Sequence, residues 1–304
     1  MDVIVKILEV LLPITLGLMF RLMGLFGDEE GEALRKLCVR FTVPALIFFS
    51  MYDMQTDTIS AMVPMVASFL LMCVALFFVG WLCSLIVSGA ARKSAVHACI
   101  TFGNYGWMGL GVSQTLLGNE GLNRVVFFIL LWWVAFYGLG IPIGLIHSGG
   151  KNRKVPIAHG IKVASPVLVC LAVGLLFNFT GFQLPGFLDA SLRPFADMTV
   201  PLILFSVGVT LDVTKVLHNV RPAAVVTAVT LVVGPIIGWI LGLVLADSDI
   251  SHKVMILEGA MPVATLTPVL AANIDLDLDL ANTAIALSTL LSLITVPMVA
   301  AIVV

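Results

Sequence analysis

The sequence predicts an all-α polytopic membrane protein with ten transmembrane helices, arranged as two inverted repeats of five helices. Three observations support this class: the composition is strongly apolar, the apolar residues form helix-length runs along the whole chain, and a short motif recurs half a chain length later. Apolar residues make up 60% of the 304 residues and charged residues 11%, and the mean hydropathy is +1.11. Because soluble domains contain roughly 45–50% apolar and about 25% charged residues, a soluble fold is excluded.

The apolar runs divide the chain into ten spans. A helix needs about 20 residues to cross a hydrocarbon core of about 30 Å, and the sequence lacks the alternating strands of a closed barrel. Charged residues or clusters of proline, glycine and asparagine separate the spans. The predicted spans cover about 2–22, 37–52, 61–87, 92–118, 123–147, 157–179, 190–211, 221–246, 252–273 and 280–303.

The first span is predicted to be a retained helix. Lys6 and Glu9 lie inside its apolar run, and no A-x-A-like cleavage site precedes the polar stretch at 28–32. A secretory signal peptide has a basic start, an uninterrupted apolar region and such a site. The pattern therefore favours a membrane span over a removed leader.

The distribution of Lys and Arg over alternate connections predicts the orientation. Cytoplasmic connections are enriched in these residues, so the richer side is predicted to be cytoplasmic and both termini face outward. The predicted cytoplasmic side has twelve Lys and Arg residues: Arg21, Arg35, Lys36, Arg40, Arg92, Lys93, Lys151, Arg153, Lys154, Lys162, Lys215 and Arg221. The opposite side has four: Lys6, Arg124, Arg193 and Lys253.

The recurring motif lies in the second and seventh spans. Residues 42–50 read TVPALIFFS and residues 199–206 read TVPLILFS, with one residue fewer. Pro44 and Pro201 are 157 residues apart. Because five spans is an odd number, two repeated halves must lie upside down relative to each other in the membrane. The predicted domains are a first repeat at 1–147, a cytoplasmic linker at 148–156 and a second repeat at 157–304.

The offset of 157 also maps residues 103–109 of span four onto residues 260–266 of span nine. The first segment is rich in glycine, and each glycine costs a helix about 1 kcal/mol relative to alanine. The second contains Pro262, and Pro268 follows it; each proline disfavours a continuous helix by about 3 kcal/mol. Two broken helices at matching positions of inverted halves are typical of the midplane site of a transporter.

Polar and flexible residues at the two breaks are the predicted substrate-binding site. An unpaired amide in hydrocarbon costs several kcal/mol, so Asn104 is expected to contact backbone, ligand or water. No Lys or Arg falls at mid-span, so an anionic substrate is expected to be held by Asn104 and by the positive ends of the half-helices. The predicted site residues are Gly103, Asn104, Tyr105, Gly106, Trp107, Met261, Pro262, Thr265 and Thr267.

Glu258 and Thr101 form a second candidate site, for a coupling cation or proton. A carboxylate at the centre of a membrane helix costs about 2.5–3.5 kcal/mol, which favours a buried position facing the protein interior. The alternative is that Glu258 extends to the interface near His252. Arg40 and Asp197, which are also 157 apart, are expected to flank or cap their helices. No cofactor or metal is expected, because the histidines and five cysteines lack ligand spacing.

Spans four, nine and ten each carry a short motif. The motifs are Gly103-Asn104-x-Gly106-x-x-Gly109, then Ala260-Met261-Pro262 with Thr267-Pro268, and finally Ser288-Thr289-Leu290-x-Ser292-x-x-Thr295-x-Pro297. Together they resemble the motifs of the auxin efflux carrier family in its short bacterial form, and the resemblance covers essentially the whole chain. Gly111 and Trp107 depart from the pattern, since many members have proline and phenylalanine there.

The resemblance implies a fold like that of the bile acid sodium symporters and of sodium–proton antiporters of the NhaA type. Spans one, two, six and seven would form a scaffold, and the other six a mobile core in which spans four and nine cross. It implies elevator-like alternating access, with Asn104 as the family's crossover asparagine and Pro262 as its span-nine proline. Plant members carry auxin, and bacterial members are linked to malate, malonate or similar carboxylates.

The expected function is therefore that of a secondary transporter for a small organic carboxylate, with Na⁺ or H⁺ as the candidate coupling ion. The alternatives are a sodium-coupled symporter of the bile-acid type and a membrane ligand sensor that does not transport. An enzyme is not expected. The expected location is the cell membrane, and the expected partners are an organic acid and the lipid bilayer, with a homodimer as one alternative. Scattered basic residues and a net charge of −2 exclude nucleic acid.

Overall fold

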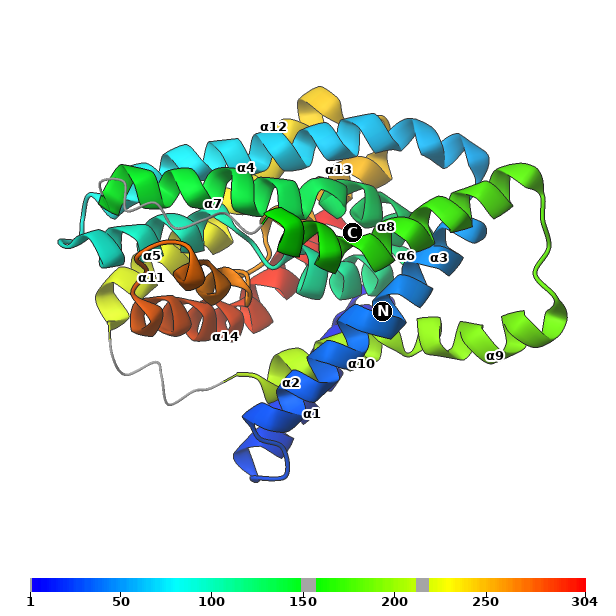
Figure 1. Ribbon diagram of the computed structural model, residues 1–304, viewed down its shortest axis with the longest axis horizontal. Helices are drawn as coiled ribbons and strands as arrows, with labels where there is room; N and C mark the ends of the chain where they lie inside the picture. The colour runs from blue at the N-terminus through cyan, green and yellow to red at the C-terminus, as the bar shows by residue number, and fades with distance from the viewer. Residues whose placement is uncertain (1, 149–156, 212–218) are drawn as a thin grey trace.

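The computed structural model describes residues 2–148, 157–211 and 219–304, and the regular elements in these ranges are helices (Figure 1). Most of the predicted linker at 148–156 lies outside the described residues. The helices are α1 (Asp2–Leu22), α2 (Asp28–Leu37), α3 (Val43–Tyr52), α4 (Met62–Ser84), α5 (Ala90–Thr101), α6 (Leu110–Phe128), α7 (Trp132–Ser148), α8 (Ile157–Thr180), α9 (Gly186–Asp197), α10 (Thr199–Val209), α11 (Val220–Ala228), α12 (Gly234–Leu245), α13 (Asp249–Gly259) and α14 (Leu278–Val303).

Short helical turns of a different pitch join several of these helices. Among the described residues, three are π-helical, Cys38–Thr42, Tyr105–Gly109 and Val229–Val233, and three are 3₁₀-helical, Thr56–Ala61, Ile129–Leu131 and Thr267–Ala272. The chain also leaves the helical conformation inside α6, where Gly118 has a φ of 70°. A positive φ favours glycine, so Gly118 marks the end of one span and the start of the next.

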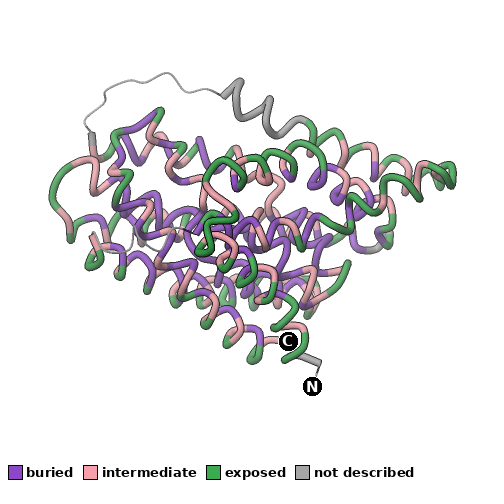
Figure 2. The backbone as a smooth tube through the Cα atoms, turned by 90° about the horizontal axis from the view of Figure 1, so that it is seen from below, coloured by how far each residue is buried: buried purple, intermediate pink, exposed green. Residues whose placement is uncertain are grey.

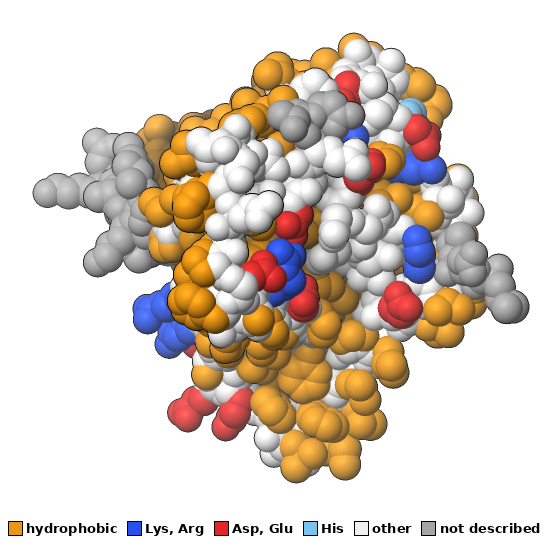
Figure 3. Space-filling view, turned by 90° about the vertical axis from the view of Figure 1, so that its right-hand side faces the viewer, with side chains coloured by type: hydrophobic (Ala, Val, Ile, Leu, Met, Phe, Trp, Pro, Cys, Tyr) orange, Lys and Arg blue, Asp and Glu red, His pale blue; other side chains and the backbone are white. Residues whose placement is uncertain are grey.

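The protein is a multi-pass membrane protein by the length and polarity of its helices. Five helical segments of the described chain are long and apolar enough to cross a bilayer: Thr58–Ser84, Tyr105–His147, Gly186–Thr210, Val220–Leu245 and Leu278–Val303. Buried residues gather along the middle of the bundle in Figure 2, and apolar side chains cover much of the face drawn in Figure 3. Such an outer surface fits a hydrocarbon environment.

The second span begins earlier than predicted. The sequence places its start near residue 37, but α2 begins at Asp28 and continues through the π-helical turn into α3. The carboxylate of Glu30 accepts a hydrogen bond from the backbone N–H of Gly27, at 2.8 Å. Acidic residues in the first turn and basic residues in the last turn of α2 also stabilise the helix dipole. The charged stretch is therefore helical and not a connection.

Glycines bring two pairs of helices into backbone contact. Gly17 of α1 lies against the carbonyl of Phe205 in α10, and Gly174 of α8 lies against the carbonyl of Phe48 in α3. The two glycines are 157 residues apart, and so are the two phenylalanines. The hydroxyl of Thr199 donates to the carbonyl of Thr42 at 2.9 Å, again across 157 residues.

A second set of glycine contacts joins neighbouring helices in each half. Gly80 of α4 lies against the carbonyl of His97 in α5, and Gly238 of α12 lies against the carbonyl of Met255 in α13. In Figure 1, α12 lies behind α4, and the two helices are in contact. Because a side chain on any of these glycines would collide with backbone, the sites require glycine.

We expect Gly17→Ala to lower the apparent melting temperature of the detergent-solubilised protein, because its methyl group would force α1 away from α10. The expected cost is about 1–3 kcal/mol. Gly138→Ala is the matched control, since a methyl group there would meet no atom within 4 Å. Equal melting temperatures for the two variants would contradict the close contact.

Candidate functional site

The helix of the fourth span is interrupted at residues 102–104. α5 ends at Thr101, Phe102 is extended with φ −114° and ψ 109°, and Asn104 has φ −80° and ψ 45°. The chain then enters the π-helical turn Tyr105–Gly109. A side chain on Gly103 would collide with the ring of Tyr105, which folds back over the interruption. The local geometry therefore depends on glycine at position 103.

The helix of the ninth span is interrupted at residues 260–266. α13 ends at Gly259, and helical structure resumes only in the 3₁₀ turn Thr267–Ala272, where Pro268 occupies the first turn. Pro262 has no backbone N–H to continue the α-helical ladder. Both interruptions lie where the glycine and proline patterns predict them.

The two interruptions pair with each other through their backbones. The N–H of Asn104 donates to the carbonyl of Pro262 at 2.8 Å, and the N–H of Ala264 donates to the carbonyl of Phe102 at 2.9 Å. These bonds form an antiparallel bridge between Gly103 and Val263. Backbone groups that leave a helix at membrane depth need other partners, and here each segment supplies them to the other.

A cavity of about 410 Å³ lies on one side of this bridge. Of the predicted site residues, Gly103, Asn104, Tyr105, Gly106, Trp107 and Thr265 line it. Met261, Pro262 and Thr267 do not line it, although all three are buried. The structure thus brings six of the predicted residues to one cavity and turns three away from it.

Asn104 combines burial with an unused hydrogen-bond donor. Its side chain is 3% exposed, and its Nδ2 atom has no hydrogen-bond partner within the described part of the chain. A buried donor without a partner loses roughly 1–3 kcal/mol. Because Asn104 also lines the cavity, a ligand oxygen placed there would remove that cost.

The walls of the cavity are mainly apolar and aromatic. Trp107, Trp132 and Trp133 contribute, together with aliphatic side chains of α3, α6 and α8. The indole N–H of Trp107 donates to the hydroxyl of Ser206 on α10 at 3.1 Å, which fixes the ring against that helix. A ligand in this cavity would meet the polar side chains of Asn104, Tyr105 and Thr265 near the interruptions and mainly apolar side chains along the walls.

The mouth of the cavity is charged, which the sequence reasoning missed. Glu32, Arg35, Lys36 and Arg40 line it, at the amino-terminal end of the second span. The sequence predicts that most of this stretch is a connection between the first two spans and that Arg40 flanks its helix. Helical spacing could have indicated this face of the second span, because positions 32, 36, 40, 43 and 47 recur at intervals of three or four residues.

Glu258 lies on α13 just before the interruption, and it is fully buried with 0% exposure. Its Oε1 accepts a hydrogen bond from the hydroxyl of Ser113 at 3.1 Å, and its Oε2 has no partner among the described residues. The carboxyl group lies directly against Gly109, where no side chain would fit. Glu258 therefore faces the protein interior and does not extend to the interface.

The hydroxyl of Thr101 forms a hydrogen bond within its own helix. Its hydroxyl donates to the carbonyl of His97 at 2.8 Å. Neither Thr101 nor Glu258 lines the large cavity. Glu258 thus has a free oxygen for a cation or a proton, whereas the Thr101 hydroxyl proton is already used.

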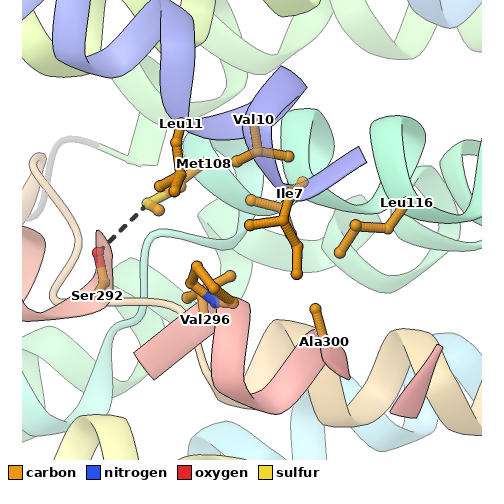
Figure 4. A pocket seen from close by; sticks show the side chains of 10 residues that line it. Ile7, Val10, Leu11, Met108, Leu116, Ser292, Val296 and Ala300 are labelled. Atoms are coloured by element: carbon orange, nitrogen blue, oxygen red, sulfur yellow. Dashed lines mark hydrogen bonds between the residues drawn. The ribbon is translucent and has the colours of Figure 1, made fainter. Parts of the chain in front are cut away.

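The described residues pack closely where α1, α6 and α14 meet. A pocket of only about 10 Å³ lies between α1, α6 and α14, lined mostly by apolar side chains (Figure 4). That volume is about the minimum for a single water molecule. The hydroxyl of Ser292 lies 3.9 Å from the sulfur of Met108, and Lys6 donates to the carbonyl of Leu116 at 2.8 Å. The much larger cavity with the basic mouth is therefore the candidate entry for a substrate.

We expect Gly109→Ala to destabilise the protein by about 1–3 kcal/mol, because the added methyl group would overlap the carboxyl group of Glu258. The loss should shrink by at least half in a Glu258→Ala background, where the carboxyl group is gone. Thermal unfolding of the two single variants and the double variant measures this coupling. Additive losses would show that the two residues are not in contact.

Comparison of the sequence with known proteins identifies its family. The family described as "Membrane transport protein" matches residues 2–156 and 154–300. An uncharacterized transporter of Methanothermobacter thermautotrophicus is 31% identical over 96% of this chain and 95% of its own length.

Two further relatives are more distant. An uncharacterized transporter of Methanocaldococcus jannaschii is 25% identical over 97% of this chain and 96% of its own length. A protein of Rhizobium meliloti named putative malonate transporter is 24% identical over 88% of this chain and 87% of its own length. The family match spans nearly the whole chain, and the relatives align almost end to end. The chain therefore belongs to the membrane transport protein family, the auxin efflux carriers that its motifs resemble.

Proposed function

We propose that this protein is a secondary transporter that moves a small organic carboxylate across the cell membrane by elevator-like alternating access. The substrate would bind in the large cavity, where spans four and nine cross. The observation that carries the proposal is the buried, unpartnered amide of Asn104 at the deep end of a cavity whose mouth holds three cations. Family membership supports transport as the activity.

An anionic substrate fits both ends of the cavity. The Asn104 amide can donate a hydrogen bond to a carboxylate oxygen, and Arg35, Lys36 and Arg40 attract negative charge to the entrance. The apolar walls would accommodate the carbon skeleton. The relative named putative malonate transporter supports a carboxylate substrate, since malonate belongs to this class.

An elevator mechanism needs a scaffold and a mobile core, which inverted repeats can supply; the distribution of Lys and Arg separately favours both termini outside. The matched contacts of Gly17 with Phe205 and of Gly174 with Phe48 support such a repeat, because equivalent positions make equivalent contacts. The scaffold would consist of α1, α2, α3, α8, α9 and α10. The core would consist of the other helices and would carry Asn104 with it.

Few polar contacts would hold the core against the scaffold in the present state. They include the bond from Trp107 to Ser206, the bond from Lys6 to the carbonyl of Leu116, and the contact between Ser50 and Asn123. An interface with few polar contacts among its described residues can slide without breaking many hydrogen bonds. The state described here would be the one open to the basic, cytoplasmic side.

Glu258 is the proposed site of the coupling ion. A fully buried carboxyl group with one free oxygen can be neutralised by a proton or can bind a sodium ion. The same group would serve the alternative function, a sodium-coupled symporter of the bile-acid type. Acceleration by protons alone would exclude the sodium-coupled alternative, and with sodium coupling the substrate, a small carboxylate or a bile acid, separates the two.

We expect Asn104→Ala to reduce uptake of labelled malonate and related carboxylates into proteoliposomes at least tenfold, because the substrate loses its buried hydrogen-bond donor. Asn119→Ala, which removes an exposed amide, is the matched control. Equal uptake by the two variants, with both folded, would remove Asn104 from the mechanism.

We also expect an imposed gradient of either protons or sodium ions to accelerate uptake by the wild-type protein, and Glu258→Gln to abolish that acceleration. Glutamine keeps the size of the side chain but has no charge to neutralise. Uptake under separate proton and sodium gradients measures the effect. Acceleration that survives in Glu258→Gln would contradict the proposed role.

A further inference from the structure

We propose that the two mouths of the transport cavity carry opposite charge, with Arg40 at one and Asp197 at the other. The carrier would then bind its anionic substrate more tightly from the basic face than from the opposite face. The inference rests on the proposed function, because it requires a cavity that opens alternately to both faces.

The mouth that is open in the structure has an excess of positive charge. Glu32 forms ion pairs with Arg35 at 2.7 Å and with Lys36 at 3.7 Å. Arg40 is exposed, lines the same cavity and has no ion pair with a carboxylate among the residues that the structure describes. Three cations therefore face one anion, and Arg40 is the cation without a carboxylate partner.

The offset of 157 residues identifies the equivalent positions in the second half. It maps the ion pair of Glu32 with Lys36 onto that of Asp189 with Arg193, which are 2.7 Å apart. The glycine and phenylalanine contacts between α1 and α10, and between α3 and α8, follow the same offset. Agreement between packing contacts and an ion pair supports this mapping over the whole stretch.

At the other two charged positions of the first mouth, the equivalent residues of the second half have a different charge. Arg35 corresponds to Leu192, and Arg40 corresponds to Asp197 at the end of α9. Asp197 is exposed and has no ion pair with a cation in the described ranges. The second mouth would thus have two anions and one cation, and its unpaired charge is negative where that of the first is positive.

In alternating access, the difference in charge between the two mouths would affect how an anion binds at each face. With inverted halves, the cavity lies against the second span when it opens to the basic face and against the seventh span when it opens to the other. Asn104 would travel with the core and serve both states, whereas Arg40 and Asp197 would each act in one state only. An anion would meet an attractive charge at one face and a repulsive charge at the other.

The test measures the half-saturating concentration of malonate or a related carboxylate at each face, in inside-out and right-side-out membrane vesicles. We expect Arg40→Gln to raise this concentration about tenfold at the basic face and to leave the opposite face unchanged. Asp197→Asn should lower it severalfold at the opposite face only. Arg40→Lys should retain most of the wild-type value, because it keeps the charge.

Arg221→Gln is the matched control, since it removes an exposed cation on the predicted cytoplasmic side outside the cavity lining. The two effects rest on separate variants, so a folding defect in one leaves the other informative. Saturable uptake in which Arg40→Gln and Asp197→Asn change neither face, or change both faces equally, would overturn the inference. Absence of saturable carboxylate uptake by the wild-type protein would instead contradict the proposed function.

Discussion

The pairing of two interrupted helices is the constraint on which the rest of the structure depends. Inside a bilayer no water is present to satisfy backbone groups, so a helix can break only where another part of the protein replaces the lost hydrogen bonds. The segments around Gly103 and Val263 do this for each other through two short backbone bonds. Neither interruption would be stable alone, and this mutual dependence fixes where the site can form.

The cavity and its polar group follow from that pairing. Because the backbone N–H of Asn104 is already bonded to Pro262, the position of residue 104 is fixed, and its side-chain amide is held at the cavity wall. The donor is then left without a partner until a ligand arrives. A preorganised donor of this kind loses little entropy on binding, which suits a carrier that must also release its substrate.

The sequence predicts the interruptions well, because glycine and proline act locally on the helix. The TVP motif in both halves also predicts an inverted repeat, which stays a prediction. The sequence does not predict features that depend on contacts between distant residues, such as the direction of a side chain or the start of a helix. Met261 lies in an irregular segment and Thr267 at the start of a short 3₁₀ turn, so the directions of their side chains could not be read from spacing. Thr101 bonds to its own helix, and the charged start of α2 is helical because capping and dipole interactions outweigh its polarity.

The most direct test of the account is a structure of the protein with a bound carboxylate, determined in lipid nanodiscs. The account predicts anion density within hydrogen-bond distance of Nδ2 of Asn104, in the cavity beside the paired interruptions. Continuous helices through residues 102–104 and 260–266, or a carboxylate bound away from Asn104, would contradict it.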